Sequence, residues 1–162
     1  MDILIGLLIG IVIGIVVAIK LTCDLCDKII KQKNKKIERL DQYYVILRKW
    51  LSTNQNGIDL SNYFKNNSYK KVAIYGLGEL GRCLVDEISK DNIIVCGIDK
   101  DISDMNYDFD LYKADDVDKI EQKIDVVVVT AISYFSSVKA MLQNSLDCDI
   151  VSLQDIINDC SI

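Results

Sequence analysis

Histidine and proline are both absent from this chain of 162 residues. Without histidine, the protein cannot use an imidazole as a general acid or base, and it cannot bind a metal ion through imidazole ligands. Without proline, no helix in the chain is kinked or ended by a proline ring. The length allows one modest domain together with additional segments.

Basic residues are scarce in the second part of the chain. Residues 69–162 carry 9 Lys and Arg against 18 Asp and Glu, a net charge of −9, whereas residues 1–68 have a net charge of +4. An acidic globular part repels the phosphate backbone of nucleic acids. We therefore expect the protein to have no nucleic-acid partner.

The cysteine pattern lacks the second pair that a zinc ribbon needs. Cys23 and Cys26 form one CxxC pair, and no other pair follows at suitable spacing. This pair lies beside an apolar N-terminal run and not at the end of a strand, so it does not fit a thioredoxin-like motif. Cys83 and Cys96 fall on predicted buried faces and are expected to act as small apolar residues. We therefore expect no metal site.

A long apolar run opens the chain. Ile3 to Ile19 holds 17 uncharged residues, all Ile, Leu, Val, Ala or Gly. At ~1.5 Å per residue a helix of this length spans about 26 Å, close to the ~30 Å of a membrane core, and Leu21 and Thr22 extend it if Lys20 snorkels. The run lacks the basic start and small-residue cleavage site of a secretory signal. We expect residues 1–22 to be an uncleaved transmembrane anchor.

Positive charge follows this run directly. Lys20 to Arg39 contains seven positive and three negative side chains, whereas only Asp2 and the terminal amine precede the run. An excess of Lys and Arg marks the cytoplasmic side of a plasma membrane, and it also suits contact with anionic lipid. We expect the N-terminus outside and the C-terminal domain in the cytoplasm, a reducing compartment that suits six cysteines without a disulfide framework.

Small residues form a stripe in the expected anchor. Gly6, Gly10 and Gly14 recur every four residues, so on a helix they leave one nearly straight line without side chains. Such a line lets two helix backbones approach closely in lipid. It favours pairing of two anchors, although glycine is common in membrane helices in general.

A weak heptad pattern continues through residues 20–51, which are predicted to be helical. Apolar residues occupy two lines of the heptad, with Lys33 as an interruption: Ile30, Ile37, Tyr44 and Leu51 on one line, and Leu40 and Leu47 on the other. Together with the glycine stripe, this pattern predicts a homodimer through the transmembrane and juxtamembrane helices. The alternative is that Tyr43, Tyr44, Leu47 and Trp50 dock on the globular domain.

Residues 23–68 are predicted to be a juxtamembrane helical linker. Within it, Ser52 to Gly57 is a polar turn, and Leu60 to Phe64 is a short helix capped near Asp59 or Ser61. The globular domain is expected to cover residues 69–162.

A strand–loop–helix–strand pattern begins this domain. Val72 to Tyr75 is an apolar run typical of a buried parallel strand, and the sequence Gly76-Leu77-Gly78-Glu79-Leu80-Gly81 follows at once. Apolar residues then recur at helical spacing. Ile93 to Ile98 is a second β-branched run, which stops at Asp99. This order of elements, with glycines at GxGxxG spacing, indicates a nucleotide-binding βαβ unit.

Each residue type in this pattern has a physical role at a phosphate site. The first glycine allows a tight turn, the second exposes backbone to a pyrophosphate, and the third lets the helix lie close to the strand. The helix N-terminus then faces the phosphates, and the terminal acid can bind ribose hydroxyls. Glu79 stabilises that helix but repels a pyrophosphate unless Arg82 compensates. The predicted cofactor-binding residues are Gly76, Leu77, Gly78, Glu79, Gly81, Arg82, Asp99, Thr130 and Ser133.

The remaining elements complete an α/β domain. The predicted elements are an edge strand near 111–112, a short helix over 115–120, a buried strand over 125–131, a helix capped by Ser133, a strand over 150–153 and a helix over 154–160. The sum is a Rossmann-like parallel sheet of four to five strands with helices on both faces.

Tyr44 to Asp99 resembles a group of small bacterial proteins associated with surface-polysaccharide and glycosyltransferase machinery. The matching residues, in order, are Trp50-Leu51, Tyr63-Phe64 and the segment Ile74 to Gly81. A wider stretch, Lys70 to Ile157, resembles Rossmann-like domains of nucleotide-sugar-modifying enzymes. The resemblance implies a nucleotide or nucleotide-sugar ligand, such as NAD, and a role beside glycan-biosynthesis enzymes.

Three functions are compatible with these patterns. The first is a membrane-tethered binding module for NAD or a nucleotide sugar. The second is an enzyme, an oxidoreductase or a nucleotide-sugar modifier, whose candidate residues are Thr130, Ser133 and Tyr134. However, none of the eight tyrosines begins the Tyr-x-x-x-Lys motif of tyrosine-dependent dehydrogenases and epimerases. The third is a scaffold in which the glycine loop is vestigial.

Overall fold

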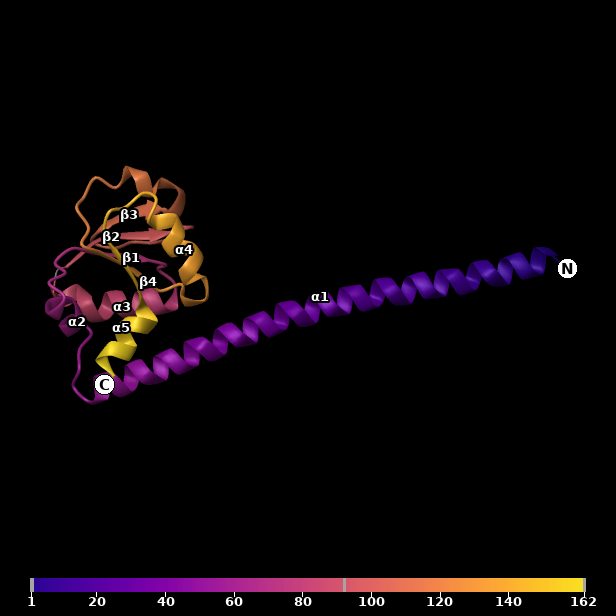
Figure 1. Cartoon of the computed structure of the whole chain (residues 1–162), viewed down its shortest axis with the longest axis horizontal. Helices are drawn as coiled ribbons and strands as arrows, with labels where there is room; N and C mark the ends of the chain where they lie inside the picture. The colour runs from indigo at the N-terminus through magenta and orange to yellow at the C-terminus, as the bar shows by residue number, and fades with distance from the viewer. Residues whose placement is uncertain (1, 92, 162) are drawn as a thin grey trace. The chain divides into compact units, whose positions relative to one another are not determined.

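The computed structural model describes residues 2–91 and 93–161 and shows an α/β protein with one long apolar N-terminal helix (Figure 1). The chain forms two compact units, Met1–Tyr44 and Val45–Ile162. The first unit is helical throughout its described residues, and the second contains a five-stranded parallel sheet.

Helix α1 runs from Asp2 to Gln55. The predicted helix over residues 20–51 is confirmed, and it continues the apolar run without a break because no proline interrupts it. Its N-terminal part is long and apolar enough to cross a membrane, and that part is not buried in the rest of the molecule. The predicted turn starts later than expected, since α1 extends to Gln55 and the chain then reverses at Gly57, which has a φ of 75°.

The last turns of α1 belong to the compact unit Val45–Ile162. Ile46, Trp50 and Thr53 recur on one side of the helix and are buried. Helix α2, Ser61–Asn66, follows; its N-cap is Leu60, without a side-chain cap, and not Asp59 or Ser61 as predicted, although the Ser61 N–H donates to Asp59 Oδ1 at 2.8 Å. Leu60 and Phe64 are completely buried. Residues 45–68, which the sequence assigns to a linker, therefore supply part of the core around the sheet.

Five parallel strands form the sheet. They are β1 (Val72–Tyr75), β2 (Ile94–Asp99), β3 (Asp110–Lys113), β4 (Val126–Val129) and β5 (Asp149–Ser152). The spatial order is β3-β2-β1-β4-β5, so β1 is central and is paired with β2 on one side and β4 on the other. The predicted parallel sheet of four to five strands is confirmed, with five.

The helices between the strands differ from the sequence prediction in their details. They are α3 (Glu79–Ile88), η1 (Ser89–Asp91), η2 (Ala114–Lys119), η3 (Ile132–Tyr134), α4 (Phe135–Leu142) and α5 (Leu153–Cys160), where η denotes a 3₁₀ helix. Ser133 does not cap α4, because it lies within η3 and the N-cap of α4 is Tyr134. The 3₁₀ turn tightens the chain at the point where the sequence suggested an α-helix start.

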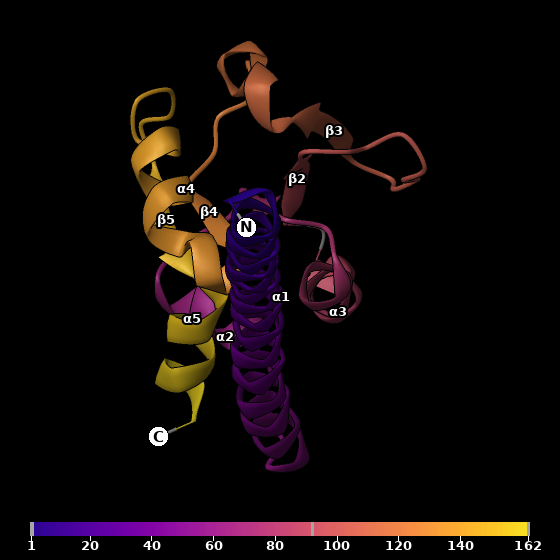
Figure 2. The same ribbon diagram turned by 90° about the vertical axis from the view of Figure 1, so that its right-hand side faces the viewer.

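Both faces of the sheet are covered. Ala73 and Tyr75 of β1 belong to an apolar cluster that includes residues of η2 and α4. Successive side chains of a strand point to opposite faces, so Val72 and Ile74 face the other side, where they are also fully buried. The buried rows of α3 and α5 lie outside the first cluster and cover this second face. Figure 2 shows β2 and β4 between α3 and α4.

The two cysteines predicted to be buried differ. Cys96 of β2 is fully buried, as predicted, whereas Cys83 of α3 is exposed. The prediction for Cys83 is wrong because α3 buries a narrow row that includes Leu80, Leu84 and Ile88 and leaves position 83 beside it.

Candidate functional site

The glycine loop, residues 76–78, joins the central strand β1 to α3 at the carboxyl ends of the strands. The Gly76 N–H donates to the Ile98 carbonyl of β2 at 2.8 Å, and the Thr130 N–H donates to the Tyr75 carbonyl at 2.9 Å. The loop therefore begins between the ends of β2 and β4. Parallel strands present all their carboxyl ends at one edge of the sheet, and this edge carries the residues singled out from the sequence.

Two of the three glycines are required by the local structure. Gly76 has a φ of 92°, and a Cβ there would lie 2.7 Å from Thr130 Oγ1. A Cβ on Gly81 would lie 2.0 Å from the Gly76 carbonyl oxygen. Since real Cβ atoms do not approach other atoms so closely, Gly76 makes the turn and Gly81 lets α3 start directly against it.

Gly78 is different, because the fold itself does not need a glycine there. Its φ of −70° and ψ of −160° suit other residues, and a Cβ would meet no atom within 4 Å. Gly78 is also exposed. The middle glycine therefore leaves bare backbone beside open space, which is the arrangement that a phosphate group needs at this position of the motif.

Helix α3 begins at the loop without a side-chain cap. Gly78 is its N-cap, and the Arg82 N–H donates to the Gly78 carbonyl at 2.9 Å. The first N–H groups of an α-helix have no acceptor within the helix, and they lie at the positive end of its dipole. Glu79 stands in this first turn, and among residues 2–91 and 93–161 no ion pair joins it to Arg82. The charge of Glu79 is thus not offset by a contact ion pair with Arg82.

Asp99 contacts the loop directly. Its Oδ2 accepts the Leu77 N–H at 2.6 Å, and its Oδ1 accepts the Asp101 N–H at 3.3 Å. One backbone donor of the loop is therefore occupied by a carboxylate of this chain. Because a carboxylate offers about four lone-pair positions, Asp99 retains capacity to accept a hydrogen bond from a ribose hydroxyl.

Thr130, at the end of β4, is buried against the same loop. Its hydroxyl donates to the Gly76 carbonyl, and Oγ1 also lies 3.2 Å from the Tyr75 carbonyl oxygen. The hydroxyl is engaged in holding the turn. Ser133 and Tyr134 follow on η3 at the same edge of the sheet and are both exposed. The structure thus brings Thr130 to the glycine loop and leaves these two side chains on the surface.

Negative charge surrounds the ends of the central strands. Burial, and then the charges of Asp99 and Asp115, raise the pKa of the Tyr75 hydroxyl above its usual value. Tyr75 therefore stays protonated at neutral pH and cannot serve as a base. Backbone N–H groups at the start of α3 are the donors here that can attract an anionic ligand without a basic side chain.

Gly97 is a residue of this edge that the sequence analysis missed. A Cβ at this position of β2 would lie 2.8 Å from Leu77 Cδ1 and 3.0 Å from Phe109 Cε2. The glycine therefore allows the loop side chain Leu77 to pack over the strand beside Phe109, whose ring stacks on Tyr107 with 4.9 Å between centroids. An isolated glycine inside a strand is a recognised sign of such a close approach.

The described residues contain no group of three or more Cys, Asp or Glu side chains arranged to hold a metal ion. A comparison of the chain with protein-family models, with curated proteins and with solved structures gives no significant match. The observations that bear on function are therefore the order of the strands and the geometry of the glycine loop.

Proposed function

We propose that this protein is a membrane-anchored binding module whose cytoplasmic α/β domain takes a nucleotide ligand, NAD or a nucleotide sugar, at the glycine loop. The observation that carries the proposal is the loop itself. Gly78 leaves bare backbone and open space at the uncapped start of α3, although the fold would accept a side chain there.

The strand order supports a Rossmann-like assignment. The order β3-β2-β1-β4-β5 is the order of the first five strands in doubly wound dinucleotide-binding sheets. From β1 the chain moves to β2 and β3 on one side and then returns to β4 on the other. Ligands of such sheets bind outside the carboxyl ends of the strands where this reversal occurs, and here that place is the edge formed by Gly76 and Thr130.

The hydrogen bonds of the loop indicate which backbone N–H groups remain for the phosphates. The N–H groups of Gly76 and Leu77 are occupied by Ile98 and Asp99. The phosphates are therefore expected over the N–H groups of residues 78–80 and not over the whole loop. The free capacity of Asp99 is available to ribose hydroxyls and would repel a 2′-phosphate, so NADH should bind better than NADPH, although the adjacent Lys100 reduces this preference.

The membrane anchor and the biological setting are also part of the proposal. The apolar part of α1 supports a single membrane crossing, and the basic residues after it support an N-out, C-in orientation in the plasma membrane. The resemblance in residues 44–99 supports a role accessory to surface-polysaccharide biosynthesis, beside glycan-biosynthesis enzymes. A reporter fused after residue 162 should be active in the cytoplasm; activity only outside it would contradict the orientation.

One observation favours a scaffold as the second candidate function. Asp99 occupies the Leu77 N–H, and Glu79 places at the start of α3 a negative charge that no ion pair offsets within the described part of the chain. Both features weaken attraction for a phosphate. In the scaffold alternative the loop only joins β1 to α3, and the domain serves to hold other proteins at the membrane.

Ligand binding by the full-length chain in lipid nanodiscs separates these functions. NAD, NADP, ADP and UDP-glucose are added at millimolar concentration while the unfolding temperature and the heat of binding are measured. We expect NAD or UDP-glucose to give heat and to raise the unfolding temperature by mass action. No heat and no shift with any of the four would contradict the nucleotide site and favour the scaffold. Conversion of a bound ligand to product would identify an enzyme.

A further inference from the structure

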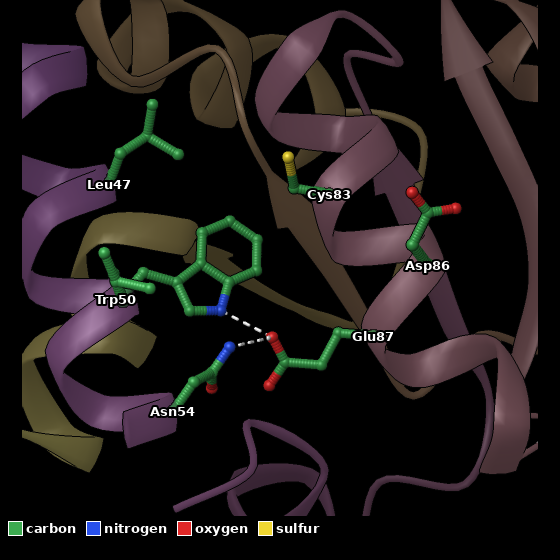
Figure 3. A pocket seen from close by; sticks show the side chains of 7 residues that line it. Leu47, Trp50, Asn54, Cys83, Asp86 and Glu87 are labelled. Carbon is green, nitrogen blue, oxygen red and sulfur yellow. Dashed lines mark hydrogen bonds between the residues drawn. The ribbon is translucent and has the colours of Figure 1, made fainter. Parts of the chain in front are cut away.

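A hollow of about 490 Å³ lies between the last turns of α1 and helix α3, within the unit Val45–Ile162 (Figure 3). Its lining from α1 is Leu47, Trp50, Leu51 and Asn54, and its lining from α3 includes Cys83 and Asp86. In Figure 3, Leu47 and Cys83 face each other across it, and Trp50 lies below them. The hollow is distinct from the glycine loop, because none of its lining residues belongs to residues 76–78.

The polar groups at the base of the hollow are already paired. The indole N–H of Trp50 donates to Glu87 Oε2 at 2.5 Å, and Asn54 Nδ2 donates to the same oxygen at 3.3 Å. The other oxygen of Glu87 accepts the Leu60 N–H at 2.8 Å. These bonds fix the base and leave an apolar opening with one carboxylate, Asp86, beside it. Such a surface suits an apolar helix edge that carries a positive charge.

Both leucines of the hollow occupy heptad positions, and the same positions are exposed along α1. The side chains of the heptad are at least 42% exposed, and they are Ile30, Ile37, Leu40, Tyr44, Leu47 and Leu51. The compact unit instead buries Ile46, Trp50 and Thr53, which lie on another side of the helix. Docking on the domain therefore uses a face of α1 that adjoins the heptad lines, and the heptad side chains themselves remain exposed, with Leu47 and Leu51 at the hollow.

We propose that a second copy of this chain covers this face, with its own α1 lying parallel and in register along the heptad and beside the hollow. In this arrangement the apolar heptad lines of one copy face the same lines of the other copy. When the line that contains Ile37 and Tyr44 is position a and the line of Leu40 and Leu47 is position d, Lys36 falls at position g and Asp41 at position e. These two positions lie opposite each other between parallel helices and here carry opposite charges. Anchoring of both copies in one membrane, as in the proposed function, gives the same parallel orientation.

Charge complementarity extends to α3. Trp50 is a g position and faces the hollow, so α3 lies on the g side of α1. In a parallel pair the g side of one helix adjoins the e side of the other. Arg48 is an e position, which places Arg48 of the second copy toward Asp86. Within residues 2–91 and 93–161 neither Arg48 nor Asp86 forms an ion pair, so both charges are available for this contact.

The decisive experiment is a charge exchange in the full-length chain, with the dimer fraction in detergent micelles measured by sedimentation. Arg48→Glu and Asp86→Arg should each lower the dimer fraction, and the double variant should restore it, since the cycle isolates the interaction of the two side chains. Restoration supports the proposal. Single variants that leave the dimer unchanged, or a double variant that adds the two losses, would overturn the Arg48–Asp86 contact and with it this arrangement.

A matched pair of variants tests the seam independently of charge pairing. Leu51→Glu places a carboxylate on the exposed heptad line and should remove most of the dimer. Val45→Glu makes the same chemical change at another exposed position, off the heptad lines, and should leave the dimer intact. Circular dichroism checks that both variants remain folded. Equal dimer fractions in the two variants, or a wild-type chain that is monomeric at every concentration, would contradict the proposal, whatever the outcome of nucleotide binding.

Discussion

At the scale of single residues, the three glycines of GxGxxG divide into two kinds. Gly76 and Gly81 are needed by the fold, because a Cβ at either position would overlap Thr130 or the loop backbone. Gly78 is needed only if something binds in front of it. A sequence pattern cannot make this distinction, since it records identity and spacing and not the space around each Cα. The structure therefore separates the two glycines that the fold requires from the one that the fold does not require.

Asp99 shows why part of the site could not be predicted. The acid at the end of β2 was expected from the motif, but its bond to the Leu77 N–H was not. A backbone donor has no sequence signature, and the two residues are far apart in the chain. Substitution of Asp99 would remove both a loop contact and a candidate ribose contact, so it cannot separate the two roles.

Thr130 provides a cleaner test of how the loop is held. Thr130→Val keeps the shape but removes the hydroxyl that donates to the Gly76 carbonyl in a buried position. We expect it to lower the free energy of unfolding by about 1–3 kcal/mol, the cost of a buried unsatisfied acceptor. Thr130→Ser retains the hydroxyl and should cost less. Thermal unfolding followed by circular dichroism compares them, and equal stability of Thr130→Val and the wild-type chain would show that the bond does not hold the turn.

At the scale of elements, the strands were the most predictable part of the fold. Runs such as Val72–Tyr75 and Val126–Val129 consist mainly of β-branched residues and are buried on both faces, which leaves few alternatives to a parallel sheet. The 3₁₀ turns and the exposure of Cys83 were not predictable, because they depend on packing between segments distant in sequence. Glu87 likewise gave no signal, although it joins α1, α3 and the residue before α2.

A hydrogen-bonded carboxylate just before β4 gives a prediction of how stability depends on pH. Asp125 Oδ2 accepts the N–H groups of Lys70 and Lys71 at 2.9 and 3.0 Å, and the bond from Lys70 is the main cause that lowers its pKa below the usual 3.8. A carboxyl group whose pKa is lower in the folded than in the unfolded state stabilises the fold at any pH above its unfolded-state pKa. This stabilisation is lost as the pH falls through the folded-state pKa.

Asp125→Asn should therefore reduce the unfolding temperature at pH 7, and the difference from the wild-type chain should shrink as the pH falls below about 3.8. Calorimetric scans of the two proteins from pH 7 to pH 2.5 measure the difference. A difference that stays constant over this range would show that the charge of Asp125 does not act through these two bonds.

At the scale of the whole molecule, the compact unit begins well before the sheet. Val45–Ile162 includes buried side chains of α1 and α2, among them Trp50 and Phe64. The sequence predicted a helical linker over residues 23–68 with a polar turn at 52–57, whereas apolar residues on either side of that turn are placed in the core. Sequence composition over a short window did not show this, since the buried residues are few and widely spaced.

Two truncated chains test where the unit begins. A chain of residues 45–162 should unfold cooperatively, whereas a chain of residues 69–162 should lose stability, because each fully buried Leu or Phe contributes about 1.5–3 kcal/mol. Leu60 and Phe64 are both completely buried. Urea unfolding followed by circular dichroism compares the two chains. A cooperative transition of equal midpoint for 69–162 would show that residues 45–68 are a true linker.

In the proposed function, the open backbone at Gly78 receives the phosphates of a nucleotide. Gly78→Ala tests it most directly, because the added Cβ meets no atom of the protein within 4 Å but occupies the space in front of the backbone. Calorimetry with NAD and UDP-glucose is carried out on the full-length wild-type and variant chains, together with their unfolding temperatures. We expect Gly78→Ala to unfold, without ligand, at the same temperature as the wild-type chain and to bind the ligand about tenfold or more weakly, the loss that 1.4 kcal/mol produces. Equal affinity in the two chains would contradict it.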